Sequence, residues 1–146
     1  MRIGEARRRT KEVDVTGRVN LDGTGEPKVS TPVSYLNHMI SILANHSLMN
    51  ITLTAKGDLI HHIGEDVAIC LGEAVKKALG ERERIIRFGY ATVPLEDSLA
   101  SASIDLAKRP YSFVELKIEK EGIEDMVAED IYHFLRSLAY SLEATI

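Results

Sequence analysis

The sequence predicts one α/β domain, built from a first half and an incomplete copy of that half. The chain has 146 residues, 45% of them hydrophobic, which is enough to bury one core. Short stretches of alternating polarity stand before and between two longer apolar stripes with helical spacing. After Gly80, a similar series of alternating stretches leads to another helical stripe. We therefore divide the domain into a first half, residues 1–80, and an incomplete second half, residues 81–146.

The first half is expected to follow the order strand, strand, helix, strand, helix. The expected elements are strands over residues 9–20 and 27–31, a helix over 34–48, a strand over 50–55 and a helix that includes the apolar run 67–79. Pro32 stands where the first helix could begin, since proline is well tolerated at a helix N-terminus. A glycine-containing turn at residues 21–25 predicts that the first two strands form a hairpin.

The second half is expected to contain three strands and one helix. These are strands over residues 88–93, 99–106 and 111–117 and a helix over 126–144, with a charged connection over 117–125. Compared with the first half, the pattern lacks a closing strand and a closing helix.

Composition argues against several classes of function. A net charge of -4 and a pI near 5.7 give no basic surface for nucleic acid, so a small phosphorylated molecule fits better than a polymer. No apolar run approaches the ~18 residues that a membrane span needs. The single cysteine, Cys70, lies on the apolar side of the second helix, and we interpret it as a core thiol in a reducing compartment. We therefore expect a cytoplasmic soluble protein.

The segment His61-His62-Ile63-Gly64-Glu65-Asp66 combines two imidazoles with two carboxylates one helical turn later. In a helix, His61 lies over Glu65 and His62 over Asp66, while adjacent residues point about 100° apart. The two histidines are therefore expected to face different directions and could serve two metal ions. Nitrogen and oxygen ligands suit Zn, Mn, Fe or Ni, and the absence of thiolates argues against a closed zinc finger. Alternatively, Glu65 and Asp66 only interact with the dipole of a helix N-terminus, and the histidines are simply polar.

Further motifs follow one another along the chain. They are Arg8-Arg9-Thr10-Lys11-Glu12-Val13, Leu21-Asp22-Gly23-Thr24-Gly25, Asn37-His38-Met39 with His46, Leu71-Gly72-Glu73-Ala74, Arg87-Phe88-Gly89, Pro94-Leu95-Glu96-Asp97 and Asp105-Leu106-x-x-Arg109-Pro110-Tyr111. Together with the histidine pair, this ordered set resembles the imidazoleglycerol-phosphate dehydratase family of histidine biosynthesis. The resemblance runs from about Arg8 to the last residue. Members of this family remove water from imidazole glycerol phosphate and give imidazole acetol phosphate.

The resemblance implies roles for all five histidines and for four other residues. It implies that His38 and His62 bind one Mn(II), that His61, Glu65 and His133 bind a second, that Glu12 and His46 contact the substrate with Glu12 transferring a proton, and that Arg87 and Arg109 hold the phosphate. Such a site suits the reaction. Removing a proton from an unactivated carbon beside an imidazole leaves charge that only the ring can absorb, and divalent cations on the ring nitrogens would stabilise it.

The resemblance also implies the fold and the assembly. The fold would be an α+β sandwich of two related β-β-α-β-α halves, each a four-stranded sheet with helices on one face, as in the second domain of ribosomal protein S5. Members of the family form trimers that associate into 24-mers, with metal sites between neighbouring subunits. We therefore expect a homo-oligomer whose partner molecule is a small phosphorylated imidazole.

One departure from the family bears on activity. The family carries a second His-His-x-x-Glu motif and a Phe-Lys pair beyond the position that matches Ile146. Without them, each metal is expected to lack at least one ligand and the phosphate to lack a lysine, so the 146-residue chain by itself is expected to be a weak enzyme or inactive. Two alternatives follow: a non-catalytic descendant of the family that acts as a metal-binding or assembly module, and a metal-free structural domain.

Overall fold

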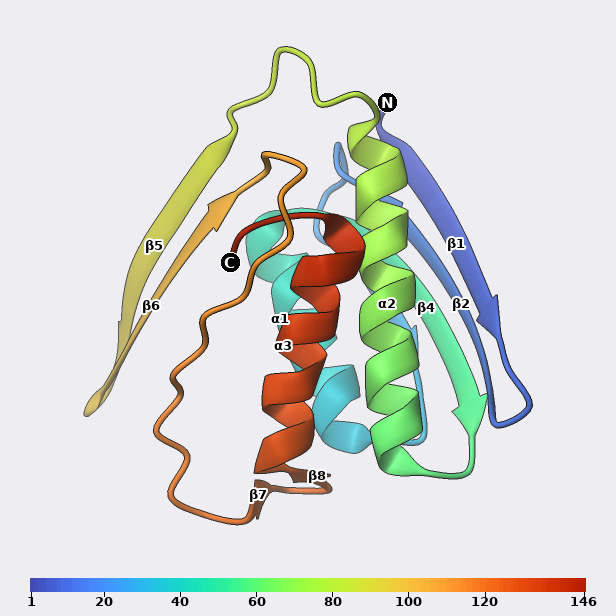
Figure 1. Cartoon of the computed structure of the whole chain (residues 1–146), viewed down its shortest axis with the longest axis vertical. Coiled ribbons are helices and arrows are strands. Elements are labelled where there is room, and N and C mark those ends of the chain that lie inside the picture. Colours follow the sequence, from blue (N-terminus) through green and yellow to red (C-terminus); the bar gives the residue numbers. More distant parts are fainter.

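The computed structural model describes all 146 residues in three layers, a four-stranded sheet, a layer of helices and a two-stranded sheet (Figure 1). In chain order the elements are β1 (Ile3–Arg9), β2 (Val13–Asn20), β3 (Pro27–Ser30), α1 (Ser34–Ser47), β4 (Asn50–Gly57), α2 (Ile60–Leu79), β5 (Phe88–Leu95), β6 (Ser98–Asp105), β7 (Gly122–Ile123), β8 (Met126–Val127) and α3 (Ala128–Leu142). The α+β fold class predicted from the sequence is confirmed. None of the helices is both long enough and apolar enough to cross a bilayer.

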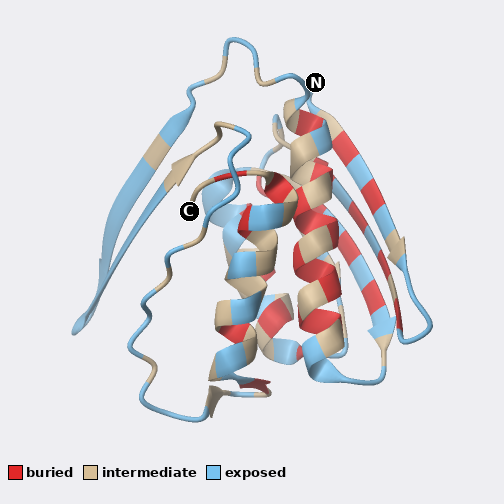
Figure 2. Ribbon diagram, viewed as in Figure 1, coloured by how far each residue is buried: buried red, intermediate tan, exposed pale blue.

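The four-stranded sheet has the order β1-β2-β4-β3, and only the β3-β4 pair is parallel. The alternation seen in the sequence places apolar side chains on one face. Val15 and Val19 of β2 and Ile51 and Leu53 of β4 are fully buried there. Helices α1 and α2 cover this face, so the main core lies between sheet and helices, as the buried segments in Figure 2 show.

Strand β1 is missing from the sequence-based expectation. Its inward-facing residues Gly4 and Ala6 are small, and its outward-facing residues include Glu5 and Arg7, so no apolar alternation marks it. Antiparallel pairing with the whole of β2 nevertheless forms the strand. Neighbouring backbone, rather than local propensity, decides its conformation.

The expected hairpin between β2 and β3 is wrong. β2 pairs with β1 and β4, whereas β3 pairs in parallel with β4. The turn at residues 21–25 is held by another contact, because the side-chain oxygen Oδ1 of Asn50 accepts hydrogen bonds from the amides of Thr24, Gly25 and Glu26 at 2.8–3.0 Å. The turn is therefore fixed to the start of β4 rather than closing onto β2.

In the second half, only two of the three expected strands form. β5 and β6 pair as an isolated antiparallel hairpin. The third expected strand, residues 111–117, has no strand conformation, and Tyr111 makes a single bridge to Thr145. A strand needs a neighbour for its backbone groups, and beyond Phe113 this segment has none. The expected helix over 126–144 is α3, which begins only at Ala128. The short β7-β8 hairpin occupies the end of the expected charged connection and the first two residues of the expected helix, Met126 and Val127.

Helix α2 packs closely against β1 on one side and α3 on the other. A Cβ atom built on Gly4 would lie 1.9 Å from the carbonyl oxygen of Ala74 in α2. One built on Gly72 of α2 would lie 2.0 Å from the hydroxyl Oγ of Ser141 in α3. Real Cβ atoms cannot approach so closely, so both glycines are needed for the distances between these elements.

Two polar groups on α2 are buried against the sheet. The Cys70 thiol donates to the carbonyl oxygen of Ala6 at 3.4 Å, and burial raises the pKa of Cys70 to about 11, which confirms a core thiol. Asp66 is only 6% exposed and forms an ion pair with Arg8 of β1, with 2.5 Å between Arg8 Nε and Asp66 Oδ1. This pair fixes the first turns of α2 to β1.

Asp125, in the turn between β7 and β8, caps helix α1 from a distant part of the chain. Its carboxylate accepts hydrogen bonds from the backbone amides of Ser34 at 2.6 Å and Tyr35 at 2.9 Å. The amide of Tyr35, together with that of Ser34, lowers the pKa of Asp125. The N-cap residue Val33 has no side chain able to do this, so Asp125 satisfies amides that would otherwise be free.

The substitution Gly4→Ala is expected to lower the free energy of unfolding by about 1–3 kcal/mol, because the added methyl group meets the backbone of α2. Urea denaturation checks this. The matched control is Gly89→Ala in β5, where an added Cβ meets only the Cγ2 methyl of Ile104 at 3.2 Å, and it should change the free energy by less than about 0.5 kcal/mol. Equal losses in the two variants would contradict the role given to Gly4.

The substitution Asp125→Ala is expected to cost roughly 0.5–2 kcal/mol at pH 7 through loss of the cap. Since the folded state lowers the pKa of Asp125, its contribution is complete above the pKa of an unfolded aspartate, about 4. It disappears as the pH falls through the lower, folded pKa. The difference between the two proteins should therefore shrink below about pH 4 in urea melts. The exposed Glu119→Ala variant serves as the control.

Candidate functional site

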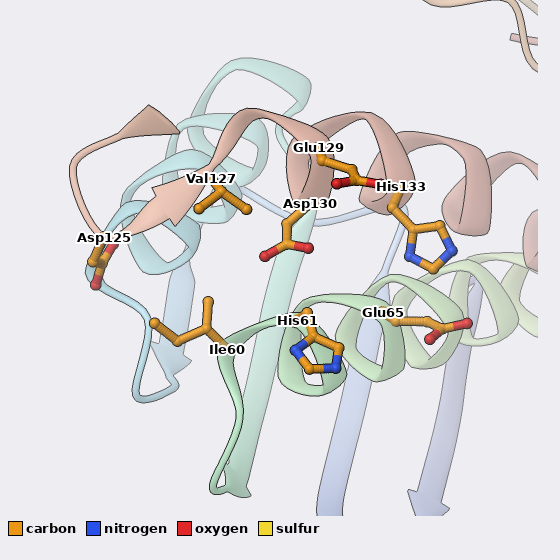
Figure 3. A pocket seen from close by; sticks show the side chains of 8 residues that line it. All are labelled: Ile60, His61, Glu65, Asp125, Val127, Glu129, Asp130 and His133. Carbon is orange, nitrogen blue, oxygen red and sulfur yellow. The ribbon is translucent and has the colours of Figure 1, made fainter. Parts of the chain in front are cut away.

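A polar pocket of about 560 Å³ lies where the N-terminal ends of α2 and α3 meet (Figure 3). The residues that line it are Ile60, His61, Glu65, Asp125, Val127, Glu129, Asp130 and His133. Carboxylates and imidazoles dominate this set and no lysine or arginine belongs to it. A hollow lined by groups of negative charge concentrates cations.

Helical spacing on both sides of the pocket explains its composition. On α2, His61 and Glu65 are four residues apart and share a face. On α3, Glu129 and His133 have the same spacing and also line the pocket, and Asp130 points toward α2 (Figure 3). The close packing of α2 on α3 at Gly72 fixes the distance between the two pairs.

Three of the predicted metal ligands, His61, Glu65 and His133, are thus brought to one pocket. No three histidine, cysteine, aspartate or glutamate side chains lie close enough together to form a ready set of metal ligands. His61 and His133 are exposed, so their side chains can still change rotamer.

His62 lies next to His61 but does not line the pocket. The planes of the two histidine rings are tilted by 56°, and their centroids are 4.0 Å apart. The rings are therefore closer together than expected for two side chains that point in different directions from the helix. The Nδ1 atom of His62 is buried and has no hydrogen-bond partner. Such an orphaned imidazole nitrogen is an available metal ligand.

The alternative explanation of Glu65 and Asp66 as helix N-terminal charges is wrong. α2 begins at Ile60, so neither carboxylate lies in its first turn. Asp66 instead forms the ion pair with Arg8, whereas Glu65 lines the pocket. The two neighbouring acids therefore have different roles, which their spacing from the histidines does not reveal.

The other predicted site residues lie outside the pocket. His38 and His46 are exposed on α1, about 12 Å apart along the helix by its ~1.5 Å rise per residue. Glu12 is exposed in the turn between β1 and β2. Since Val13 pairs with Gly57, Glu12 lies beside the end of β4 from which the chain turns into α2.

The two predicted phosphate residues lie at the opposite end of α3 from the pocket. Arg87 forms a two-pronged ion pair with Asp105 at the end of β6, with N–O distances of 2.5 and 2.8 Å. The hydrogen bonds from Arg87, with additional attraction from Arg109, lower the pKa of Asp105. Arg109 is held near this site by its carbonyl oxygen, which accepts a hydrogen bond from Thr145. α3 has 15 residues and is therefore about 22 Å long (Figure 1). Within one chain, the predicted metal ligands in the pocket and the predicted phosphate-binding arginines thus lie at opposite ends of this helix.

Sequence reasoning missed three acids that line the pocket. Glu129 and Asp130 precede His133 by one helical turn, and this spacing in a predicted helix was the available signal. Asp125 gave no such signal, because its partners Ser34 and Tyr35 lie 91 and 90 residues away in the sequence.

The chain is similar to known proteins in sequence and in structure. The sequence model of the family "Imidazoleglycerol-phosphate dehydratase" matches residues 31–146. The chain is 43% identical over 141 residues to imidazoleglycerol-phosphate dehydratase from Syntrophomonas wolfei, covering 94% of this chain and 72% of that protein. It is 39% identical over 149 residues to the enzyme of the same name from Clostridium kluyveri, covering 100% and 77%.

Solved structures agree with the sequence relatives. The crystal structure of IGPD from Pyrococcus furiosus matches with a TM-score of 0.82 and 34% identity, covering 95% of this chain and 75% of that one. The imidazoleglycerol-phosphate dehydratase from Staphylococcus aureus has a TM-score of 0.83 at 23% identity, covering 98% and 80%, and it supports the fold alone. The match of the family model, the identity to relatives and the shared fold together lead to one conclusion. The chain belongs to the imidazoleglycerol-phosphate dehydratase family.

Proposed function

We propose that this protein is an imidazoleglycerol-phosphate dehydratase, a hydro-lyase of histidine biosynthesis that converts imidazole glycerol phosphate into imidazole acetol phosphate and water. Family membership gives the reaction. The observation that supports it best is the pocket in which His61, Glu65 and His133 come together from α2 and α3. Since Cys70 is a free buried thiol, we also propose that the enzyme works in the cytoplasm.

The proposed cofactor is Mn(II). Imidazole nitrogens and carboxylate oxygens are suitable ligands for this ion, and the pocket offers both together with a negative lining. His61, Glu65 and His133 would hold one ion, and His62, with its free buried Nδ1, would hold a second together with His38. When bound, the ions supply Lewis-acid stabilisation of negative charge on the imidazole ring of the substrate.

The remaining residues would bind the substrate and move its proton. Glu12 is an exposed carboxylate able to take a proton from carbon and return it, and His46 is proposed to contact the same substrate. Arg87 and Arg109 present guanidinium groups suited to phosphate oxygens. Asp105 already orients Arg87, so a phosphate would bind beside an ordered guanidinium group.

We propose that the active site is shared between copies of the chain. The predicted metal ligands and phosphate residues lie at opposite ends of α3, about 22 Å apart by its length, and a small phosphorylated imidazole cannot span that distance. The pocket of one copy would therefore face the arginines of another, which requires a homo-oligomer such as the trimer or 24-mer implied by the family. A shared site would explain why the proposed Mn(II) ligands of one chain do not by themselves form two complete sets.

Metal binding should depend more on His61 than on His38. His61 belongs to the proposed three-ligand set, whereas His38 is exposed and outside the pocket. We expect His61→Ala to lower bound Mn at least ten-fold, comparable with the ~10 to 100-fold typical of a lost supporting group, and His38→Ala to lower it less. Elemental analysis of protein purified without a histidine tag measures the metal content. Equal Mn in the two variants would contradict the ligand sets.

Dehydratase activity is tested with imidazole glycerol phosphate and excess Mn(II), following imidazole acetol phosphate. We expect product formation, at a rate below the ~1 per second usual for enzymes, because the His38 and His62 set offers the second ion only two protein ligands. Glu65→Gln should abolish it. Bound Mn without any product would favour the non-catalytic alternative.

The control for the shared site mixes two inactive variants. His61→Ala damages the proposed metal end, and Arg109→Ala damages the phosphate end, where the Arg109 side chain forms no ion pair of its own. Refolded together, the two variants should regain part of the activity, because some interfaces then combine two intact halves. No recovery in an oligomer of mixed composition, or a monomeric mass by light scattering at micromolar concentration, would contradict sharing.

A further inference from the structure

The β7-β8 turn contacts the beginnings of all three helices. Asp125 in this turn reaches the first turn of α1 through its carboxylate. The next residue, Met126, is buried in the main core, and its terminal methyl group lies 3.2 Å from the position that a Cβ atom would take on Gly64 of α2. Val127 then leads directly into α3. Three consecutive residues therefore connect the three helices that carry the predicted metal ligands.

Asp125 is bound to α1 by both of its oxygens. Oδ2 accepts a hydrogen bond from the amide of Ser34 at 2.6 Å, and Oδ1 accepts one from the amide of Tyr35 at 2.9 Å. Helix α1 has no acidic residue in its own first turn, and its N-cap Val33 forms no side-chain hydrogen bond. The free amides and the dipole at the start of a helix both favour a negative group there. A residue from the distant β7-β8 turn therefore supplies the negative group that α1 lacks.

The same side chain belongs to the polar pocket. Asp125 lines it together with His61, Glu65 and His133, which come from α2 and α3 (Figure 3). Because each oxygen of Asp125 already accepts a hydrogen bond from α1, a move of this carboxylate toward a cation would disturb the cap. Asp125 thus joins the pocket to a helix that contributes no other residue to its lining.

Helix α1 carries His38 close to this contact. His38 follows Ser34 by four residues, so the two share a face of the helix and lie about 6 Å apart along its axis. Elsewhere α1 packs through apolar side chains such as Leu36 and Ile40. Apolar contacts are not directional, whereas hydrogen bonds are. The two bonds to Asp125 therefore fix the direction and the place of the first turn of α1.

We propose that Asp125 is a positioning residue of the two-ion site. It holds the first turn of α1 at the pocket, and so sets the place of His38 relative to the ligands that line the pocket, without binding an ion itself. This inference rests on the proposed function, in which His38 and His62 bind the second Mn(II). Loss of the Asp125 contact weakens the second ion and leaves the first, in the pocket, nearly unchanged.

Calorimetric titration of the full chain with Mn(II) tests this, and the variants His38→Ala and His61→Ala identify which binding step belongs to which ion. We expect Asp125→Ala to weaken the second ion roughly 10 to 100-fold, as does loss of a group that orients a metal ligand. The first ion should weaken by less than about five-fold, which is the effect of one charge in a solvated pocket.

Two further variants separate the cap from the charge. Asp125→Asn removes the charge but keeps an oxygen able to cap a helix as well as aspartate does, so the second ion should stay within about five-fold of its original affinity. Glu124→Ala removes an exposed carboxylate from the same turn and should leave both ions nearly unchanged. In metal-free protein, hydrogen exchange at the start of α1 should be faster in Asp125→Ala than in Asp125→Asn.

Three outcomes would overturn the positioning role while two bound ions still support the proposed function. They are equal weakening of both ions in Asp125→Ala, unchanged affinity for both ions in Asp125→Ala, and equal loss of the second ion in Asp125→Asn and Asp125→Ala. Equal loss in the last two variants would mean that the charge of Asp125 acts on the ion directly. A wild-type chain that binds no Mn(II) would contradict the proposed function itself, and the positioning role with it.

Discussion

The position of helix α2 depends on two glycines, Gly4 and Gly72, where the absence of a side chain lets neighbouring elements approach closely. At Gly4 the backbone of β1 meets the carbonyl oxygen of Ala74, and at Gly72 the backbone of α2 meets Ser141 of α3. Without these close approaches, the helix could not lie tightly against the sheet and against α3 at once. The ion pair of Asp66 with Arg8 adds a fixed point at its first turns. The polar pocket is a consequence, because it forms where the tightly packed helices begin.

The acidic, imidazole and guanidinium side chains of the predicted site lie at two different ends of α3. Acids and imidazoles collect at the N-terminal end of α3, and the ordered guanidinium of Arg87 lies beyond its C-terminal end. The length of a single helix thus sets the separation between the acid-rich pocket and the Arg87 guanidinium group. In the proposed shared site, association of copies would bring these groups together.

Patterns of neighbouring residues in the sequence correctly predicted features that depend on neighbouring residues in the structure. The alternation around Ile51 and Leu53, the apolar stripes of the helices and the shared face of His61 and Glu65 are all found in the structure. Long-range contacts explain the failures. β1 forms because β2 lies beside it, and residues 111–117 stay irregular because no strand lies beside them. The roles proposed for Glu12, His46 and the arginines come from resemblance, because no local pattern around these residues indicates them.

The burial of Cys70 makes this residue a natural reporter of opening between helix and sheet. Only a thiolate reacts quickly with alkylating reagents, and a pKa of about 11 leaves few thiolates at neutral pH. The side chain is also fully covered, with its hydrogen directed at the carbonyl oxygen of Ala6. Reagent can reach it only when α2 separates from β1 and β2. The rate of alkylation therefore measures how often the central packing of this protein comes apart.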